Sequence, residues 1–379
     1  MGITEFHIDV PQADLDDLKE RLGRARWPEH ETVGDWSQGV PIVWLRDICH
    51  YWAETYDWRA AEARLNQFAH FRTDLDGLGI HFIHARSPEP DAIPLVMTHG
   101  WPGSVVEFLK VIGPLSDPRS HGGDPADAFH VVCPSLPGYG FSDKPTETGW
   151  GLERIGRAWA TLMADLGYSS YVAQGGDWGS AVTSCIGAQD PEHCVAIHLN
   201  IPPCTPTAEQ LGDMNEAEIL AMQDIAHHQR WGTGYSTEQM TRPQTIGYSL
   251  VDSPVGQAAW ILEKFWAWTD CDGHPENALT RDELLDNVSL YWLTATGASS
   301  ARLYWESLEH FMTAGGPVGV PTGVTVLPKE IVRISRRWAE NRFSDLRYWN
   351  EVDRGGHFAS FEQPEIFVDE LRTFFRLFR

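Results

Sequence analysis

The segment that most constrains the fold of this chain is residues 175–179, which read Gly-Gly-Asp-Trp-Gly. A strand-like run precedes it at residues 171–174, and a helix-like run follows it at residues 181–186. Glycine at its first and last positions lets a strained turn form and lets the helix close onto the strand. The segment therefore predicts a strand, a sharp turn that presents Asp177, and a helix. An ordinary turn with an aspartate helix cap would give the same local pattern.

The aspartate in this turn decides which chemistry the segment could perform. Serine at such a turn attacks esters and amides and forms an acyl-enzyme. A carboxylate that attacked the same carbonyl would form a high-energy anhydride, whereas attack on a saturated carbon gives an alkyl ester that water can hydrolyse. Asp177 as a nucleophile therefore favours opening of an epoxide or displacement of a halide, and it argues against ester hydrolysis.

Two further loops have the spacing of consecutive strand–helix units. The apolar strand predicted at residues 94–98 runs into residues 99–104, which read His-Gly-Trp-Pro-Gly-Ser. Such a loop can present a backbone N–H to an oxyanion, together with the backbone N–H of Trp178. The next predicted strand, residues 129–134, runs into a loop at residues 135–142 that contains two glycines. Three such units in order predict an α/β core.

The C-terminal region supplies a candidate base and a candidate acid. Residues 354–358 read Arg-Gly-Gly-His-Phe and place His357 on a glycine loop before a predicted terminal helix at residues 363–378. Glu330 follows a predicted strand at residues 323–327, where an acid could orient the imidazole of His357. The order nucleophile, acid, histidine is that of the α/β-hydrolase fold. The sequence leaves two other acids open for this role: Asp345 and Asp353.

Together these motifs resemble the microsomal-type epoxide hydrolases of the α/β-hydrolase superfamily over nearly the whole chain. The resemblance assigns the oxyanion loop to residues 99–104, the nucleophile turn to residues 176–179, the acid to residues 328–330 and the histidine loop to residues 354–358. The histidine follows the acid by 27 positions, which also matches that family. The resemblance implies an active site with Asp177 as the nucleophile, His357 as the base and Glu330 as the acid. It also implies an oxyanion hole made by the backbone N–H groups of Trp101 and Trp178.

The resemblance also implies two tyrosines that project from a cap domain and polarise the epoxide oxygen. The matching positions are Tyr235, shortly before residues 242–245, and Tyr304, in an Arg-Leu-Tyr context. A phenol suits this task because it is neutral at pH 7 and donates a strong hydrogen bond. Either tyrosine could instead only pack in the cap, and Tyr248 and Tyr291 are alternatives.

The predicted fold class is an α/β-hydrolase core with an inserted helical cap and a helix-rich N-terminal extension. Apolar positions at helical spacing in residues 219–228 and 253–269 indicate the cap. A minority of the cap tryptophans are expected to line an apolar pocket above the core. The predicted organisation is a lead-in domain at residues 1–78, a first core segment at 79–205, the cap at 206–318 and a second core segment at 319–379.

Charge, hydropathy and cysteine content argue against several classes of binding partner and cellular location. The net charge is −24 and no run of basic residues is present, which argues against binding to nucleic acid or anionic membranes. No apolar stretch reaches the ~18 residues of a membrane span, and no secretory signal is visible. The six cysteines lack metal-type spacing and suit buried thiols in the cytoplasm. The pair His227-His228 lacks supporting ligands, so we expect no metal, and a homodimer is left open.

The predicted function is hydrolysis of a hydrophobic epoxide to a vicinal diol through an aspartyl alkyl ester. The epoxide and water are the only reactants expected, with no metal or organic cofactor. Two alternatives stay open: a haloalkane dehalogenase that uses the same aspartate, with Trp178 as a halide donor, and a catalytically silent ligand-binding member of the fold. The sequence does not fix the natural epoxide, the substrate-binding residues or the regio- and enantioselectivity.

Overall fold

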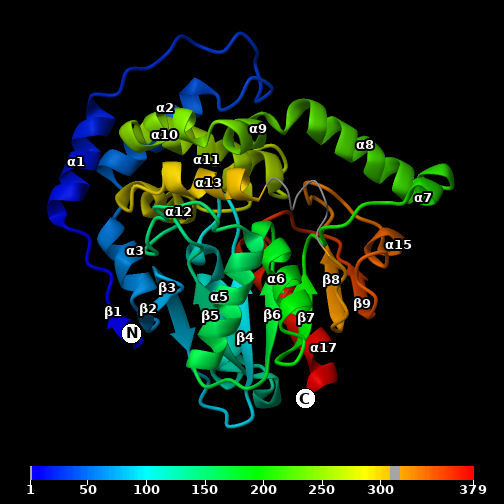
Figure 1. The fold of residues 1–379 in the computed structure, drawn as a ribbon. Coiled ribbons are helices and arrows are strands. Elements are labelled where there is room, and N and C mark those ends of the chain that lie inside the picture. The colour runs from blue at the N-terminus through cyan, green and yellow to red at the C-terminus, as the bar shows by residue number, and fades with distance from the viewer. Residues whose placement is uncertain (1, 308–315) are drawn as a thin grey trace.

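A nine-stranded sheet forms the centre of the molecule in the computed structural model, which describes residues 2–307 and 316–379 (Figure 1). The strand order is β1-β2-β3-β5-β4-β6-β7-β8-β9. The strands from β5 to β9 run parallel, whereas β1, β2 and β3 join antiparallel. The strands are β1 Thr4–Phe6, β2 His70–Leu75, β3 Leu78–Ala85, β4 Ile93–Thr98, β5 Phe129–Pro134, β6 Tyr171–Gly175, β7 Cys194–Leu199, β8 Thr322–Val326 and β9 Leu346–Glu351.

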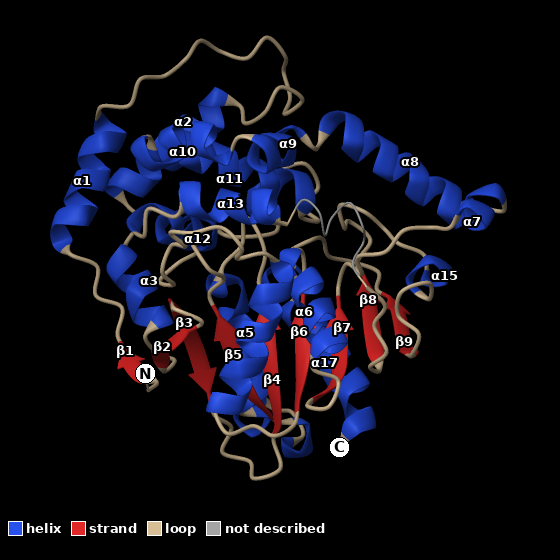
Figure 2. Ribbon diagram, viewed as in Figure 1, coloured by secondary structure: helices blue, strands red, loops and turns tan. Residues whose placement is uncertain are grey.

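Helices cover both faces of the parallel region of the sheet (Figure 2). All five residues of β6 and all five of β8 are buried, as expected for parallel strands, whose apolar side chains are shielded on both faces. Helices α5 (Leu152–Asp165) and α6 (Trp178–Gln189) pack together on the near face in Figure 1. Helices α4 (Leu109–Ser116) and α17 (Pro364–Phe375) pack together on the other face.

The lead-in segment contributes both helices and strands. Its helices are α1 (Gln12–Gly23), α2 (Ile42–Glu54) and α3 (Trp58–Leu65). Strands β1 and β2 also lie within residues 1–78, and β2 pairs with β3 along its whole length. The lead-in segment therefore extends the core sheet and does not form a layer separate from it.

The cap is inserted between β7 and β8 and lies over the carboxyl ends of the parallel strands (Figure 1). Residues 308–315, near the end of the predicted cap, lie outside the described residues. The cap helices are α7 (Ala208–Gly212), α8 (Glu216–Trp231), α9 (Gly234–Thr241), α10 (Pro243–Asp252), α11 (Pro254–Trp268), η4 (Pro275–Asn277), α12 (Arg281–Leu293) and α13 (Gly297–Glu306). The short remaining helices are η1 (Val105–Phe108), η2 (Pro118–His121), η3 (Pro125–Asp127), α15 (Arg336–Ala339), α16 (Ala359–Glu362) and η5 (Arg376–Phe378).

Polar contacts anchor the cap to the lead-in segment. The indole N–H of Trp52 donates to Ser289 Oγ over 2.8 Å, and the hydroxyl of Tyr56 donates to Asp286 Oδ1 over 2.8 Å. The carboxylate of Asp286 also pairs with Arg64 over 2.7 Å. These contacts are buried or partly buried, so separating the cap from the lead-in segment would leave polar groups of helix α12 without these partners. The lead-in segment thus holds the cap in place above the sheet.

None of the helices in the portion of the chain that the structure describes is both long enough and apolar enough to cross a membrane.

Candidate active site

Asp177 occupies the sharp turn between β6 and α6. Its backbone has φ +51° and ψ −131°, a conformation that residues other than glycine rarely adopt. A Cβ atom at Gly175 would lie 2.1 Å from the carbonyl oxygen of Gly179, and one at Gly179 would lie 1.9 Å from that of Thr98. Both glycines are therefore required by close backbone packing, and the predicted strand, turn and helix are present.

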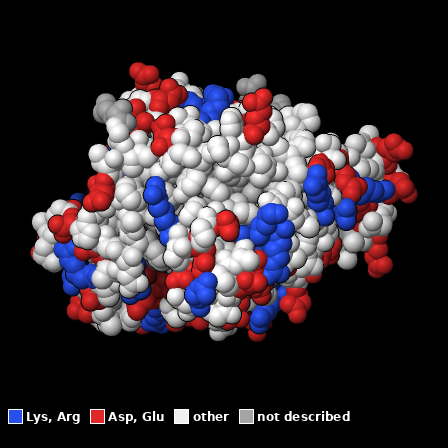
Figure 3. Space-filling view, turned by 90° about the horizontal axis from the view of Figure 1, so that it is seen from below, with Lys and Arg blue, Asp and Glu red and all other residues white. Residues whose placement is uncertain are grey.

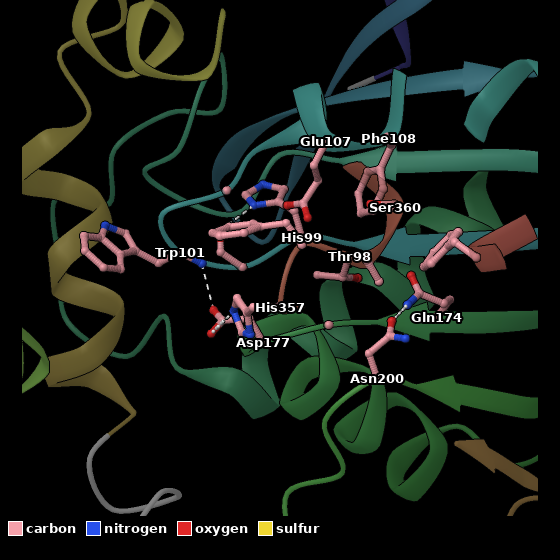
Figure 4. A pocket seen from close by; sticks show the side chains of 16 residues that line it. Thr98, His99, Trp101, Glu107, Phe108, Gln174, Asp177, Asn200, His357 and Ser360 are labelled. Atoms are coloured by element: carbon pink, nitrogen blue, oxygen red, sulfur yellow. Dashed lines mark hydrogen bonds and ion pairs between the residues drawn. The ribbon is translucent and has the colours of Figure 1, made fainter. Parts of the chain in front are cut away.

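The carboxylate of Asp177 meets both the oxyanion loop and the histidine loop (Figure 4). The backbone N–H of Trp101 donates to Oδ1 over 2.8 Å, and His357 Nε2 lies 3.2 Å from Oδ2. A Cβ atom at Gly100 would lie 2.1 Å from Oδ1, so glycine allows the loop to approach the carboxylate. Trp178 is the first residue of α6, and its backbone N–H has no acceptor within its own helix. The turn thus places the carboxylate against the backbone N–H of Trp101 and leaves the N–H of Trp178, the next residue, without a partner in its own helix.

His357 lies between two carboxylates. Its Nδ1 is 2.5 Å from Glu330 Oε1, and the side chains of both residues are 2% exposed. Burial lowers the pKa of His357, but the charges and hydrogen bonds of Glu330 and Asp177 outweigh burial and raise the pKa well above its ordinary value. The imidazole is thus oriented by Glu330 and directed at Asp177.

The two other acids considered for this role lie elsewhere. Asp345 forms an ion pair with Arg347 over 2.8 Å, and Asp353 is exposed. The carboxylate next to the imidazole belongs to Glu330, which follows β8 and is fixed by a 2.8 Å hydrogen bond from the backbone N–H of Ile331.

Tyr235 on α9 and Tyr304 on α13 lie beside the oxyanion loop, with ring centroids 5.9 Å apart. Trp101 stacks on Tyr235 at 4.9 Å, and Trp178 meets Tyr304 edge to face at 4.7 Å. Burial raises the pKa of both tyrosines, so both phenols are neutral at ordinary pH. Within the described segments of the chain, no well-formed hydrogen bond engages the hydroxyl of Tyr304.

The alternative tyrosines have other positions. Tyr248 is 68% exposed on helix α10. Tyr291 is buried, and its hydroxyl donates to the carbonyl oxygen of Gly103 over 2.8 Å. Tyr291 therefore supports the oxyanion loop from behind.

The cap also contacts the histidine loop directly, which the sequence did not indicate. The backbone N–H of His357 donates to the carbonyl oxygen of Trp268 over 2.8 Å, and the two side chains meet edge to face at 5.1 Å. The carboxylate of Glu362 accepts backbone N–H bonds from residues 356 and 358, on either side of His357, and from Asp270 at the end of the cap helix. Among the cap tryptophans, Trp268 therefore lies at the site, whereas Trp231 and Trp305 are exposed.

We predict that Glu362→Gln lowers the free energy of unfolding by about 1–3 kcal/mol, because the amide cannot accept all three N–H groups. Burial raises the pKa of Glu362 to about 7, and the three backbone bonds oppose that rise. Urea unfolding of the variant and the wild type measures the difference. Glu365→Gln, on the first turn of α17, is the matched control, and equal stability of all three proteins would contradict the prediction.

No group of three or more His, Cys, Asp or Glu side chains in residues 2–307 and 316–379 has an arrangement that could hold a metal ion. His227 and His228, at the end of α8, are included in that statement.

Comparison with known proteins places the chain in a family. Residues 3–108 match the family model described as "Epoxide hydrolase N terminus", and residues 93–236 match the "alpha/beta hydrolase fold". A protein of Stigmatella aurantiaca named "Putative epoxide hydrolase" is 57% identical over 378 residues, covering 100% of this chain and 86% of that protein. Epoxide hydrolase 1 of Sus scrofa is 36% identical, covering 99% of this chain and 89% of that protein.

Solved structures agree with this placement. The juvenile hormone epoxide hydrolase of Bombyx mori has a TM-score of 0.90 at 32% identity, covering 100% of this chain and 96% of that one. The epoxide hydrolase of Aspergillus niger has a TM-score of 0.88 at 33% identity, covering 100% and 97%. These relatives do not favour the haloalkane dehalogenase alternative. The chain belongs to the epoxide hydrolase family, on an α/β-hydrolase fold.

Proposed function

We propose that this epoxide hydrolase converts a neutral, hydrophobic epoxide to a vicinal diol in two steps, with an alkyl ester of Asp177 between them. The proposal rests mainly on the groups that surround the carboxylate of Asp177. Asp177 meets a backbone N–H on one side and the imidazole of His357 on the other, and two neutral phenols lie nearby.

In the first step, Asp177 attacks a carbon of the epoxide ring and the carbon–oxygen bond breaks. Tyr235 and Tyr304 hydrogen-bond the leaving oxygen, and one of them passes its proton to the alkoxide. Burial supports this role because it keeps both hydroxyls protonated until charge develops on the epoxide oxygen. The relief of ring strain makes this step favourable without a metal or an organic cofactor.

In the second step, water attacks the ester carbonyl of Asp177 while His357 takes a proton from that water. Glu330 orients the imidazole and stabilises its charged form, as the 2.5 Å contact supports. The backbone N–H groups of Trp101 and Trp178 stabilise the oxyanion that forms on the ester oxygen. Release of the diol restores the carboxylate.

The surroundings of the site favour an uncharged, apolar substrate. Trp101, Trp178 and Trp268 pack against the rings of Tyr235 and Tyr304 beside Asp177. Acidic and basic side chains are scattered among uncharged ones on the face away from the cap, which Figure 3 shows, and the whole chain has a net charge of −24. An anionic epoxide would approach against that net charge.

Oxygen labelling tests the covalent intermediate. A single turnover of styrene oxide in ¹⁸O-water is expected to give an unlabelled diol, because the added oxygen comes from Asp177 and the label enters the carboxylate. Mass spectrometry of the diol gives the result. Label in the first diol would mean that water attacks the epoxide directly and would contradict the mechanism.

We predict that Tyr235→Phe and Tyr304→Phe each slow ester formation by about tenfold to a hundredfold, because each removes a hydrogen bond that strengthens in the transition state. Ester hydrolysis should change much less. Stopped-flow tryptophan fluorescence under single-turnover conditions separates the two steps. Tyr248→Phe, at an exposed position, is the control and should match the wild type. Equal slowing of both steps in the site variants would contradict a specific role of the hydroxyls.

The six cysteines support a proposal about location. They are unpaired, and five of them are buried. Free thiols are typical of a reducing compartment, so we place the enzyme in the cytoplasm. A homodimer stays a prediction that size-exclusion chromatography with light scattering would test.

A further inference from the structure

A buried lysine lies beside one of the two tyrosines of the site. Lys264, on the cap helix α11, is 6% exposed, and its Nζ lies 4.4 Å from the centre of the Tyr235 ring. Within the described segments of the chain, the one carboxylate that pairs with it belongs to Glu263, the preceding residue. Removing an ammonium from water costs free energy, so lysine is rarely buried to this extent. The two steps of the proposed mechanism do not use this ammonium.

The cap and the oxyanion loop together enclose the ring of Tyr235. Lys264 and Trp268 are one helical turn apart on α11 and both face this ring, with 5.2 Å between the centroids of the two aromatic rings. Trp101 reaches toward the cap from the oxyanion loop (Figure 4) and stacks on the ring, with the two planes 10° apart. Two indoles and one ammonium thus fix the orientation of this phenol.

The ammonium of Lys264 is better placed to stabilise negative charge on Tyr235 than on Asp177. It lies over the ring of Tyr235, and it forms no ion pair with Asp177 in the part of the chain that the structure describes. The proposed first step moves negative charge in this direction, because the carboxylate of Asp177 becomes a neutral ester while a phenol that gives up its proton becomes anionic. A fixed cation close to that phenol stabilises the transition state more than the free enzyme, which is the condition for a faster step.

The surroundings of Tyr235 otherwise work against loss of its proton. Burial raises the pKa of Tyr235, and the charge of Asp177 raises it further. The neighbouring Tyr304 lowers it and Glu263 raises it by smaller amounts. Asp177 loses its charge as it attacks, but the effect of burial persists through the step. An ammonium near the ring opposes that effect, because its attraction to the ring grows as the ring gains negative charge.

We propose that Lys264 is a positioning residue for ester formation and that it acts through Tyr235. Its ammonium holds the phenol in place together with Trp101 and Trp268, and it stabilises the negative charge that the phenol gains when its proton moves to the epoxide oxygen. This inference rests on the proposed ester mechanism, and it assigns the proton transfer to Tyr235. Tyr304, over whose ring no Lys or Arg side chain of the described residues lies, then acts as a hydrogen-bond donor.

The first step is complete in atoms and electron pairs with these groups. An oxygen of Asp177 forms a bond to the epoxide carbon as the carbon–oxygen bond of the ring breaks, and the electron pair of that bond goes to the epoxide oxygen. That oxygen takes the proton of the Tyr235 hydroxyl, which leaves a phenolate near Lys264. The phenolate regains a proton in the second step, when hydrolysis leaves one proton of the water on the released carboxyl of Asp177.

The test measures both steps in Lys264→Met, Lys264→Gln and Lys264→Arg by stopped-flow fluorescence under single-turnover conditions with styrene oxide. Methionine keeps the bulk and removes the charge, so ester formation should slow by about tenfold while ester hydrolysis changes less than about threefold. Arginine keeps the charge and should restore most of the rate. Glutamine keeps a polar group at the buried position, should slow ester formation as methionine does, and provides a second measurement if the methionine variant folds poorly.

Combined variants show whether Lys264 acts through Tyr235. In a Tyr235→Phe background, Lys264→Met should slow ester formation by less than about threefold further, because the hydroxyl on which it acts is gone. In a Tyr304→Phe background, the effect of about tenfold should remain. Lys110→Met is the matched control, since Lys110 also lies over an aromatic ring, that of Phe361, and also pairs with a glutamate. It should match the wild type in both steps.

Ester formation at the wild-type rate in Lys264→Met, or an undiminished effect of that substitution in the Tyr235→Phe background, would overturn the role of Lys264. Equal slowing of both steps in Lys264→Met would show a general structural effect and would overturn it as well. A wild-type enzyme that forms diol without any ester adduct in the mass spectrum would instead overturn the proposed mechanism, and the two failures are thereby distinguished.

Discussion

Replacement of Asp177 by alanine is expected to lower epoxide turnover by a factor on the order of 10⁶, the scale measured when a nucleophile is removed from a hydrolase of similar design. The alanine side chain can neither attack the epoxide nor carry the ester that His357 and water would resolve. Both steps are lost together, so no adduct should appear. Diol formation measured by chromatography and the intact mass of the protein after exposure to substrate give the two readouts.

Asp345→Ala is the matched control, because it removes a partly exposed aspartate that pairs with Arg347 and, among the described residues, contacts none of those in the active site. It should keep the wild-type turnover. Residual turnover of Asp177→Ala within about a hundredfold of the wild type would indicate direct attack of water on the epoxide. Asp177 would then act as a base and not as a nucleophile.

The nucleophile turn could be predicted from the sequence because its constraints are local. Gly175 and Gly179 are needed because another part of the backbone passes within 3 Å of a would-be Cβ atom, and Gly100 is needed because the side chain of Asp177 does. The strand runs on each side are short and apolar, and the structure has strands at each of them. The fold class and the family assignment depend on such segments, and both are confirmed.

Other features of the site depend on contacts between segments that are distant in sequence. Glu362 and Asp270 are 92 residues apart, and neither belongs to a recognisable motif, yet their contact joins the cap to the histidine loop. The sequence could not tell which cap tryptophan lies at the active site. Apolar residues at helical spacing show which face of a helix is buried, but not which part of the protein that face packs against. The structure places Trp268 against His357 and Tyr235. The contact of a buried cap lysine with the same tyrosine was also missed, because a single lysine on a helix does not show which ring it packs against.

His357→Ala is expected to stop the reaction halfway. Ester formation needs Asp177 and the two tyrosines, so it should proceed within about tenfold of the wild-type rate. Ester hydrolysis should slow by about 10²–10⁴-fold, the usual contribution of a general base. The intact protein should therefore gain the mass of one epoxide, and digestion should place that mass on the peptide that contains Asp177. His193→Ala, at an exposed histidine, is the control and should show no lasting adduct.

The electrostatics of the site suit His357 to act as a base in the second step. In the free enzyme, the charges of Glu330 and Asp177 raise the pKa of His357, which favours the imidazolium form. Ester formation removes the negative charge of Asp177, so one of the two causes of that shift disappears and the pKa of His357 falls. The imidazole becomes a better acceptor of a proton only after the nucleophile has reacted. Hydrolysis in the wild type should therefore speed up as pH rises through a pKa lower than that of the free enzyme, and rapid-quench measurements of ester decay between pH 5 and pH 9 would show it. Decay that does not depend on pH in that range, together with no adduct in His357→Ala, would remove His357 from the second step.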